Sequence, residues 1–298
     1  MIVAIGIDGD HTFARFVERT KSINIPVKVL NLRDFVDGDW CFEVPAREPA
    51  QLHNGNQLIE LSPDDAFYCR MIDLSSHEPD AARAKRWRAL LSGLRAWLET
   101  IPGRVVNPAR GGEHNSSKPL HEAVLQGMGF AIPDSITTCD VEAVRRFIDD
   151  GPTISKTVCG VRADAISVTE ADFVGFEPAS GPVHLQRQVS GADARIHVIG
   201  SHVIAQRVDA DTADYRREGR FDDLKVFEPP SALCSLLVRA TRELGLEFAG
   251  WDFKIDANEV YWCLEANPMP GYSPYDSRCD GAITTHLLRH LGADVPAP

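Results

Sequence analysis

The chain has 298 residues, of which 44% are hydrophobic and 25% are charged. These values are close to globular averages, so they exclude a fibrous or an intrinsically disordered chain. Asp and Glu outnumber Lys and Arg by 43 to 31, which gives a net charge of −12. Duplex nucleic acids and anionic membranes both require a basic surface, so we expect no nucleic-acid partner and no membrane partner.

The seven cysteines are dispersed along the chain, and no two of them form a Cys-x-x-Cys pair. An odd, scattered set indicates reduced thiols and argues against a clustered zinc site. The N-terminal run lacks the basic segment of a signal peptide, and no apolar run approaches the ~18 residues of a membrane span. The sequence therefore predicts a soluble, cytoplasmic protein.

The first hundred residues alternate predicted strands and helices. An apolar run at 2–7 predicts a strand, a helix follows from about His11, and 27–30 predicts the next strand, which is typical of a parallel α/β layer. Short strands and hairpins are expected over 39–71. A long helix is expected at 79–99, with a row of core side chains at helical spacing: Trp87, Leu90, Leu91, Leu94, Trp97 and Leu98.

The second part of the chain begins after a Pro-Gly break, which suggests a domain boundary near residue 105. Pro119 predicts the first turn of a helix whose apolar face carries Leu120, Ala123, Val124 and Met128. The remaining elements that we expect are helices at 140–148, 231–244 and 281–291, strands at 153–158, 165–168, 183–189, 194–199 and 202–208, and a hairpin at 250–265.

The hairpin contains the candidate metal ligands. A turn centred on 257–258 puts Asp252 opposite Cys263, so residues at even spacing from Cys263 share its face. Asp252, Glu265 and Asn267 then project from one side. Two carboxylates and a carboxamide that converge through oxygen suit a hard cation such as Mg²⁺. Acidic residues on a strand face are often only solvated, but the apolar flanking strands here favour a metal site.

A second group of candidates is basic. Lys156 lies in a predicted strand, where a buried ammonium group is costly unless it meets an anion; an edge strand facing water is the alternative. Lys118 starts a helix after a Ser-rich loop, although taken alone it is a surface lysine. Arg195 and Arg207 lie on consecutive strands, and Arg216 lies on a loop where solvation is the default. Together they predict a phosphate clamp facing the metal site, as phosphoryl transfer requires.

These motifs resemble those of the ATP-grasp superfamily, specifically its RimK-like branch, which includes ligases that cyclise or cross-link ribosomally made peptides (graspetide or microviridin-type ligases). Residues 265–268 match the Glu-x-Asn-Pro magnesium motif, and Asp252 matches the acidic residue one strand earlier. Lys118 and Lys156 match the two nucleotide-phosphate lysines. Residues 193–200 resemble the branch's Asp-x-Arg-Val-x-Val-x-Gly strand.

The adenine-holding strand of that branch is matched by residues 185–189. The contacts that the resemblance implies for the nucleotide are Lys118, Lys156, Gln186, Arg187, Gln188, Val189 and Asp193. Arg187 stands where an acidic residue is common. Segments at 68–70, 102–108 and 214–217 are similar to the peptide-ligase subgroup, whereas 269–274 lacks its Gly-Gln-Trp.

The fold implied by the resemblance is an α/β ATP-grasp fold in three parts. An N-terminal pre-ATP-grasp domain is expected over 1–105, a small central lid over 106–184, and the C-terminal ATP-grasp lobe over 185–298. The nucleotide would lie between the lid and the C-terminal sheet.

The activity implied by the resemblance is ATP-dependent ligation of a carboxylate to an amine, or to a hydroxyl or thiol, through an acyl phosphate with release of ADP and phosphate. The cofactors are ATP and Mg²⁺, with Mn²⁺ as a substitute. Asp252, Glu265 and Asn267 would hold the metal, and Arg195, Arg207 and Arg216 would be catalytic. Three interpretations stay open: a peptide- or protein-modifying ligase, a ligase for amino acids or other small acids, and a non-catalytic Mg-ATP-binding protein. Homodimers are common in the resembled family.

Overall fold

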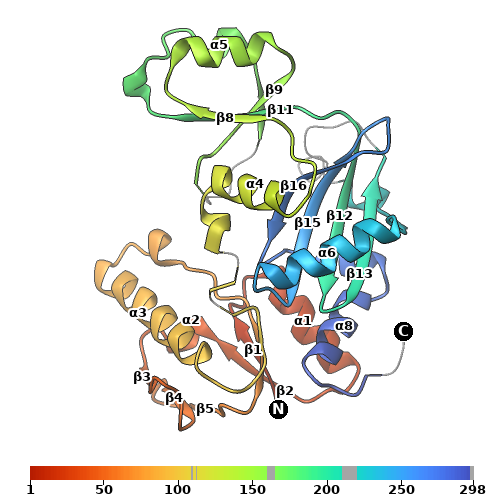
Figure 1. Ribbon diagram of the computed structural model, residues 1–298. Helices are drawn as coiled ribbons and strands as arrows, with labels where there is room; N and C mark the ends of the chain where they lie inside the picture. The colour runs from red at the N-terminus through yellow and green to blue at the C-terminus, as the bar shows by residue number, and fades with distance from the viewer. Residues whose placement is uncertain (109, 112, 160–164, 210–219, 296–298) are drawn as a thin grey trace.

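The computed structural model describes residues 1–108, 110–111, 113–159, 165–209 and 220–295. Within these ranges the chain forms eight α-helices and four sheets, which Figure 1 shows as three parts. The N-terminal elements lie at the lower left, a small green sheet lies at the top, and the C-terminal sheet lies at the right. None of the described helices is both long enough and apolar enough to cross a membrane.

The N-terminal part contains a parallel sheet in the order β2-β1-β6-β7, as the predicted β-α-β opening requires. Alternate residues of β1 face two different cores, because successive side chains of a strand point to opposite sides. Val3 and Ile5 pack toward α3 (Ala81–Leu98), whereas Ile2 and Ala4 pack toward α1 (His11–Ser22) and the C-terminal helix α8 (Ala282–His290). The elements of this part are β1 (Ile2–Gly6), α1 (His11–Ser22), β2 (Val27–Asn31), α2 (Leu32–Phe35), β3 (Asp39–Cys41), β4 (Ala50–His53), β5 (Leu58–Leu61), β6 (Ala66–Cys69), η1 (Ser75–His77), α3 (Ala81–Leu98) and β7 (Val105–Val106).

Helix α3 confirms the prediction made for 79–99. Asp80 caps its first turn by accepting hydrogen bonds from the amides of Ala82 and Arg83. All six side chains expected in the core are buried, and they pack against the strands of the N-terminal sheets.

The central part contains a small antiparallel sheet in the order β10-β9-β11-β8. Residues 185–187 belong to this sheet, although we expected them in the C-terminal lobe; the boundaries of the three domains stay predictions. The elements are η2 (Glu113–Ser116), α4 (Lys118–Gly127), β8 (Ser135–Thr138), α5 (Val141–Asp149), β9 (Thr153–Lys156), β10 (Ile166–Val168), η3 (Glu170–Phe173), η4 (Pro178–Ser180) and β11 (Val183–Arg187).

The C-terminal part is an antiparallel sheet in the order β14-β13-β12-β15-β16. Apolar side chains on one face pack against α6, which Figure 1 shows in front of the sheet. The elements are β12 (Ala192–Ile199), β13 (His202–Val208), η5 (Arg220–Asp223), β14 (Lys225–Phe227), α6 (Ser231–Glu243), β15 (Phe248–Ile255), β16 (Tyr261–Asn267), α7 (Ser273–Arg278) and α8 (Ala282–His290).

Helix α4 differs from its prediction. The side chains expected on its buried face include Leu120, which is 52% exposed, whereas His121, Glu122 and Leu125 are buried. The helix turns two polar side chains inward because His121 finds a hydrogen-bond partner on β16 and Glu122 finds its partners in the central sheet, as described below.

Candidate active site

A row of polar side chains crosses the C-terminal sheet. Gln206, Arg195, Asp252 and Glu265 are direct neighbours on four successive strands, β13, β12, β15 and β16. Cross-strand neighbours in an antiparallel sheet lie on the same face, about 5 Å apart at Cβ. The row therefore gathers residues that are up to 70 positions apart in the chain.

Two ion pairs lie in and beside this row. The Arg195 guanidinium is 2.7 Å from Asp252 Oδ1, and both side chains are largely buried. The Lys118 ammonium, at the start of α4, is 3.2 Å from Glu265 Oε2, and these two side chains are 18% and 26% exposed. Both predicted metal carboxylates are thus matched by a cation, which offsets the cost of placing them in a partly dehydrated site.

The hairpin register is a correction to the sequence analysis. Phe253 pairs with Cys263, and a β-bulge then makes Asp252 pair with Glu265, so Leu264 is the extra residue. Cys263 is buried with Phe253 in the core on the α6 side and does not share the face of Glu265. We expected Asp252 opposite Cys263, which is off by one position. The bulge restores the parity, so Asp252 and Glu265 still share a face.

Gly250 allows Arg195 to lie flat over β15. A Cβ atom at this position would stand 2.4 Å from the Arg195 guanidinium and 2.6 Å from Pro270 Cβ, which no side chain could tolerate without displacing one of them. Arg195 is therefore enclosed by Asp252, Gly250 and the loop that follows β16. This enclosure fixes the direction of its charge.

Helix α4 is fastened to β16 through His121. Its Nε2 accepts a hydrogen bond of 2.9 Å from the amide of Ala266, next to Glu265. Its Nδ1 must then carry the proton, which it donates to His114 Nδ1 at 2.7 Å. Burial, together with the nearby His114, lowers the pKa of His121 to about 4, so the ring is neutral near pH 7.

Glu122 organises the central sheet beside α4. Its carboxylate accepts hydrogen bonds from Gln186 Nε2 at 2.7 Å and from His184 Nε2 at 3.1 Å, and the other oxygen accepts from the Ser135 hydroxyl at 2.5 Å. Burial alone would raise the pKa of Glu122, but the hydrogen bonds from His184 and Ser135 lower it. Glu122 is therefore a buried, ionised carboxylate.

Lys156 lies directly across from His184 in the central sheet, so the two side chains share one face of that sheet. Burial lowers the pKa of its ammonium, and Lys118 lowers it further, while Glu122 and Glu265 raise it. The Lys156 ammonium group makes no hydrogen bond or ion pair with any residue in the described ranges. The two predicted phosphate lysines thus lie near Glu265, one from α4 and one from β9.

The predicted adenine-strand residues are divided between different contacts. The Gln186 side chain is buried against Glu122. Arg187 donates to the Gly151 carbonyl at 2.8 Å and lies over the Phe147 ring, so its side chain belongs to the central part. Gln188 accepts from Ser167, and Val189 is half-buried after the end of β11. The amides of Arg187 and Gln188 donate to the carbonyls of Asp134 and Pro152, and the role of this strand in nucleotide binding stays a prediction.

Asp193, an expected nucleotide contact, and Arg207, an expected member of the phosphate clamp, both pair with other residues of the chain. Asp193 is paired with Lys254, 2.9 Å away. Arg207 is adjacent to Gln206 on β13, and it therefore points to the opposite face from Arg195. It donates to Asp209 at 2.6 Å. The structure does not bring Arg207 into the cluster, and Arg216 lies outside the described residues.

The sequence analysis missed His121 and Glu122. Both follow Lys118 within one turn of α4, which is the only signal that could have placed them beside the site. We assigned the apolar residues of this segment to the buried face. Polar residues on a helix are normally solvent-exposed, so the pattern gave no reason to bury these two.

The oxygen ligands fit a magnesium ion that is shared with phosphate. Asp252 and Glu265 supply carboxylates, and Asn267 Oδ1 accepts a 2.8 Å hydrogen bond from the Met269 amide, which leaves it a second lone pair. In the described part of the chain, no group of three or more His, Cys, Asp and Glu side chains is arranged to hold a metal alone. Mg²⁺ commonly takes one or two carboxylates and completes its shell with phosphate oxygens and water.

Comparison with known proteins identifies the fold. No family model and no curated protein sequence matches the chain. The macrocyclase MdnC of Microcystis aeruginosa MRC, bound with its precursor peptide MdnA, superimposes with a TM-score of 0.80 at 18% identity, over 99% of this chain and 100% of that one. An ATP-grasp ligase of Chryseobacterium gregarium, in complex with ADP and leader and core peptides, gives 0.81 at 17% identity, over 99% and 97%.

A third structure, the ATP-grasp ligase PsnB complexed with a minimal precursor, gives a TM-score of 0.77 at 23% identity over 97% of this chain and 98% of that one. The expected α/β ATP-grasp fold is therefore confirmed over nearly the whole chain. At these identities the likeness concerns the fold, and the activity must be argued from the site.

Proposed function

We propose that the chain is an ATP-dependent ligase that joins a carboxylate of a peptide substrate to an amine, with a hydroxyl or thiol as alternative nucleophiles. The observation that carries this proposal is the row of Arg195, Asp252 and Glu265, faced by Lys118 and Lys156, on an ATP-grasp fold. Such a set neutralises phosphate oxygens and positions them, which is most of what phosphoryl transfer requires.

The cofactors in this proposal are ATP and Mg²⁺, with Mn²⁺ as a substitute. Asp252, Glu265 and Asn267 would hold the metal, which when bound neutralises charge on the transferring phosphate. Lys118 and Lys156 would bind phosphate oxygens, and Arg195 would orient Asp252 and face the developing charge. Support comes from PsnB, which has been solved with Mg, ADP and its precursor.

The chemistry proceeds in two steps that this site suits. An oxygen of the substrate carboxylate attacks the γ-phosphorus of ATP, the bond from phosphorus to the bridging oxygen of ADP breaks, and an acyl phosphate forms. The nucleophile then attacks the acyl carbon, the bond to the phosphate oxygen breaks, and the nucleophile loses its proton. No enzyme nucleophile is needed, so Lys118, Lys156 and Arg195 act only through charge and position.

A peptide substrate is the interpretation that we favour. The likeness to MdnC and to the Chryseobacterium gregarium ligase covers nearly the whole of each chain, and both were solved with peptides bound.

Arg216 remains a predicted catalytic residue. The predicted homodimer is tested by light scattering during size-exclusion chromatography.

The experiment for the proposal is acyl trapping with hydroxylamine. The pure protein is incubated with Mg-ATP, hydroxylamine and a panel of carboxylates, from free amino acids to Glu- and Asp-rich peptides. We expect ADP and a hydroxamate with a peptide. A hydroxamate with an amino acid only would favour the small-acid ligase, and release of AMP would contradict the acyl-phosphate mechanism. Mg-dependent nucleotide binding without turnover across the panel would favour a non-catalytic protein.

A further inference from the structure

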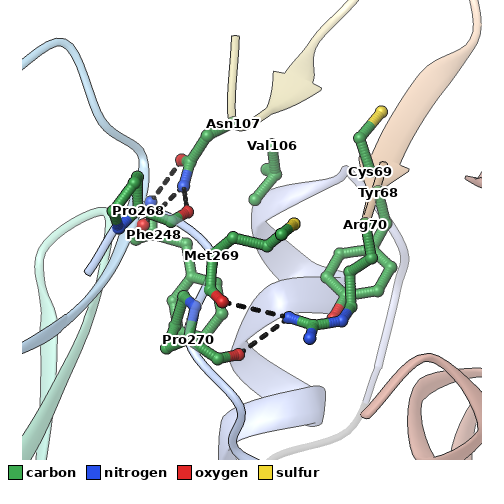
Figure 2. Close-up of a pocket in the computed structure, with 9 residues that line it drawn as sticks. All are labelled: Tyr68, Cys69, Arg70, Val106, Asn107, Phe248, Pro268, Met269 and Pro270. Carbon is green, nitrogen blue, oxygen red and sulfur yellow. Dashed lines mark hydrogen bonds between the residues drawn. The ribbon is translucent and has the colours of Figure 1, made fainter. Parts of the chain in front are cut away.

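Two sequence segments that resemble the peptide-ligase subgroup meet at one small hollow. Figure 2 shows Tyr68, Cys69 and Arg70 at the end of β6 on one side, and Val106 and Asn107 at the end of β7 on another. The third side is the loop that follows the predicted metal ligand Asn267, together with Phe248 at the start of β15. The space measures about 10 Å³, about the room that one water molecule needs, so it cannot be a nucleotide pocket.

Arg70 connects the N-terminal part to this loop. The residue is 6% exposed, and its charge is matched by Asp10, to which its Nε donates a hydrogen bond. Its Nη1 donates to the Pro270 carbonyl at 2.9 Å and to the Met269 carbonyl at 3.4 Å (Figure 2). A guanidinium can serve a carboxylate and two carbonyls at once because it has five donors in a fixed plane, whereas an ammonium cannot match this geometry.

Asn107 joins the same loop to the start of β15. Its Oδ1 accepts hydrogen bonds of 2.9 Å from the amides of Glu247 and Phe248. Its Nδ2 donates to the Phe248 carbonyl at 2.6 Å and also to the Pro268 carbonyl. The carboxamide therefore uses both of its ends to hold the first residue of β15 beside the residue that follows Asn267.

The loop held in this way carries both a predicted ligand and the wall around Arg195. The amide of Met269 donates to Asn267 Oδ1 and so orients this oxygen. The carbonyl of the same residue, Met269, is contacted by Arg70. Pro270 lies over Gly250, where it closes the space beside Arg195. Three successive carbonyls, of Pro268, Met269 and Pro270, are thus fixed by side chains from outside the C-terminal sheet.

We infer that Arg70 and Asn107 are positioning residues for the metal site, which act by fixing the loop at 268–270 and through it the Asn267 oxygen. This inference rests on the proposed function, because it requires that Asn267 ligates a metal. It makes the N-terminal part a component of the site, although none of its side chains reaches the row on the C-terminal sheet. Removing a group that orients a metal ligand typically lowers the affinity for the metal about 10–100-fold.

The test measures Mn²⁺ affinity by electron paramagnetic resonance at saturating ADP. The variants are Arg70→Lys, which keeps the charge beside Asp10, and Asn107→Asp, which keeps the acceptors for β15 but removes the donors. We expect each to weaken Mn²⁺ binding at least tenfold while ADP affinity in EDTA changes less than twofold. Arg88→Lys on the exposed side of α3 and Asn56→Asp in the β4–β5 turn are the matched controls.

The inference is overturned if both variants bind Mn²⁺ within twofold of the wild type. A purely structural role would lower the midpoint of thermal unfolding without a change in Mn²⁺ affinity, and it too would overturn the inference. If Arg70→Lys does not fold, Asn107→Asp decides. Wild-type protein that binds Mn²⁺ with ADP but forms no hydroxamate contradicts the proposed function alone, and this inference is still decided by the affinities. Wild-type protein that binds no Mn²⁺ with ADP contradicts both.

Discussion

Two lysines in two different sheets show how the same residue type is used in two ways. Lys254 on β15 is buried, and its ammonium lies 2.9 Å from an Asp193 carboxylate oxygen and 3.2 Å from the Gly191 carbonyl. Lys156 on β9 is half-buried and has no such partner among the described residues, and burial lowers its pKa. The first lysine is satisfied within the chain, and the second is suited to an anion from outside.

The largest expected effect is a difference in the free energy of unfolding between variants of the two lysines. Lys254→Met leaves the Asp193 carboxylate buried without this cation, which costs about 3–5 kcal/mol of the free energy of unfolding. Lys156→Met removes no ion pair and is expected to cost less than about 1 kcal/mol. Urea unfolding at pH 7 measures both variants. Equal losses in the two variants would remove the distinction between a structural and a binding lysine.

The next effect concerns the carboxylate near Lys156. Glu265→Gln removes the charge that the proposal assigns to metal binding, and we expect ADP release to fall more than 100-fold, equivalent to about 3 kcal/mol. Glu243→Gln on the exposed side of α6 is the control. ADP release from Glu265→Gln close to the wild-type rate would contradict the metal assignment.

A third prediction uses pH to test how α4, which carries Lys118, is held to β16. Unfolded His121 takes up a proton near pH 6.5, whereas the folded protein resists protonation until about pH 4, so stability falls as the pH drops through this window. Between pH 7 and pH 5, the wild type should lose about 2 kcal/mol more of its unfolding free energy than His121→Gln, which does not titrate but can still accept from Ala266.

The groups around His121 are His114, Lys118, Glu122 and Glu265, and they are unchanged in this comparison. Urea unfolding of both proteins at the two pH values isolates the histidine. Parallel losses in the wild type and in His121→Gln would show that His121 does not fasten α4 in the way the hydrogen bond indicates.

The smallest effect is on nucleotide binding. Lys156→Met should raise the dissociation constant for ADP about tenfold, or about 1.4 kcal/mol, because one charge-assisted contact to phosphate is lost. Its affinity should also become less sensitive to salt. Lys85→Met on the exposed side of α3 is the control, and isothermal titration calorimetry is the measurement. An unchanged dissociation constant would contradict the assignment of Lys156 to phosphate.

The parts of the molecule that could be predicted are those with a strong local pattern. The apolar row of α3 and the parallel opening of the N-terminal sheet follow from periodicity alone. The sequence predicts that Asp252 and Glu265 share a face, but it does so through a register that is one position off, and the bulge at Leu264 compensates for this error. A bulge has no signature in one sequence, because it depends on how both strands pack.

The rest depended on contacts between distant segments. Glu122 is buried because Gln186 and His184, more than 60 residues away, hydrogen-bond to it. Arg207 alternates with Gln206 on β13, and because Gln206 lies opposite Arg195, Arg207 points to the other face of the sheet. Arg70 and Asn107 were recognised as parts of motifs, but only the folded chain brings them to the loop after Asn267.

The contact of α4 with β16 also has a consequence for solubility. β16 is the last strand of its sheet, and an edge strand with free amides can recruit strands from other molecules and so begin aggregation. Here the amide of Cys263 donates to the Ala131 carbonyl and that of Ala266 donates to His121. The same segment that brings Lys118 to Glu265 thus occupies hydrogen-bonding positions that a second copy of the chain could otherwise use.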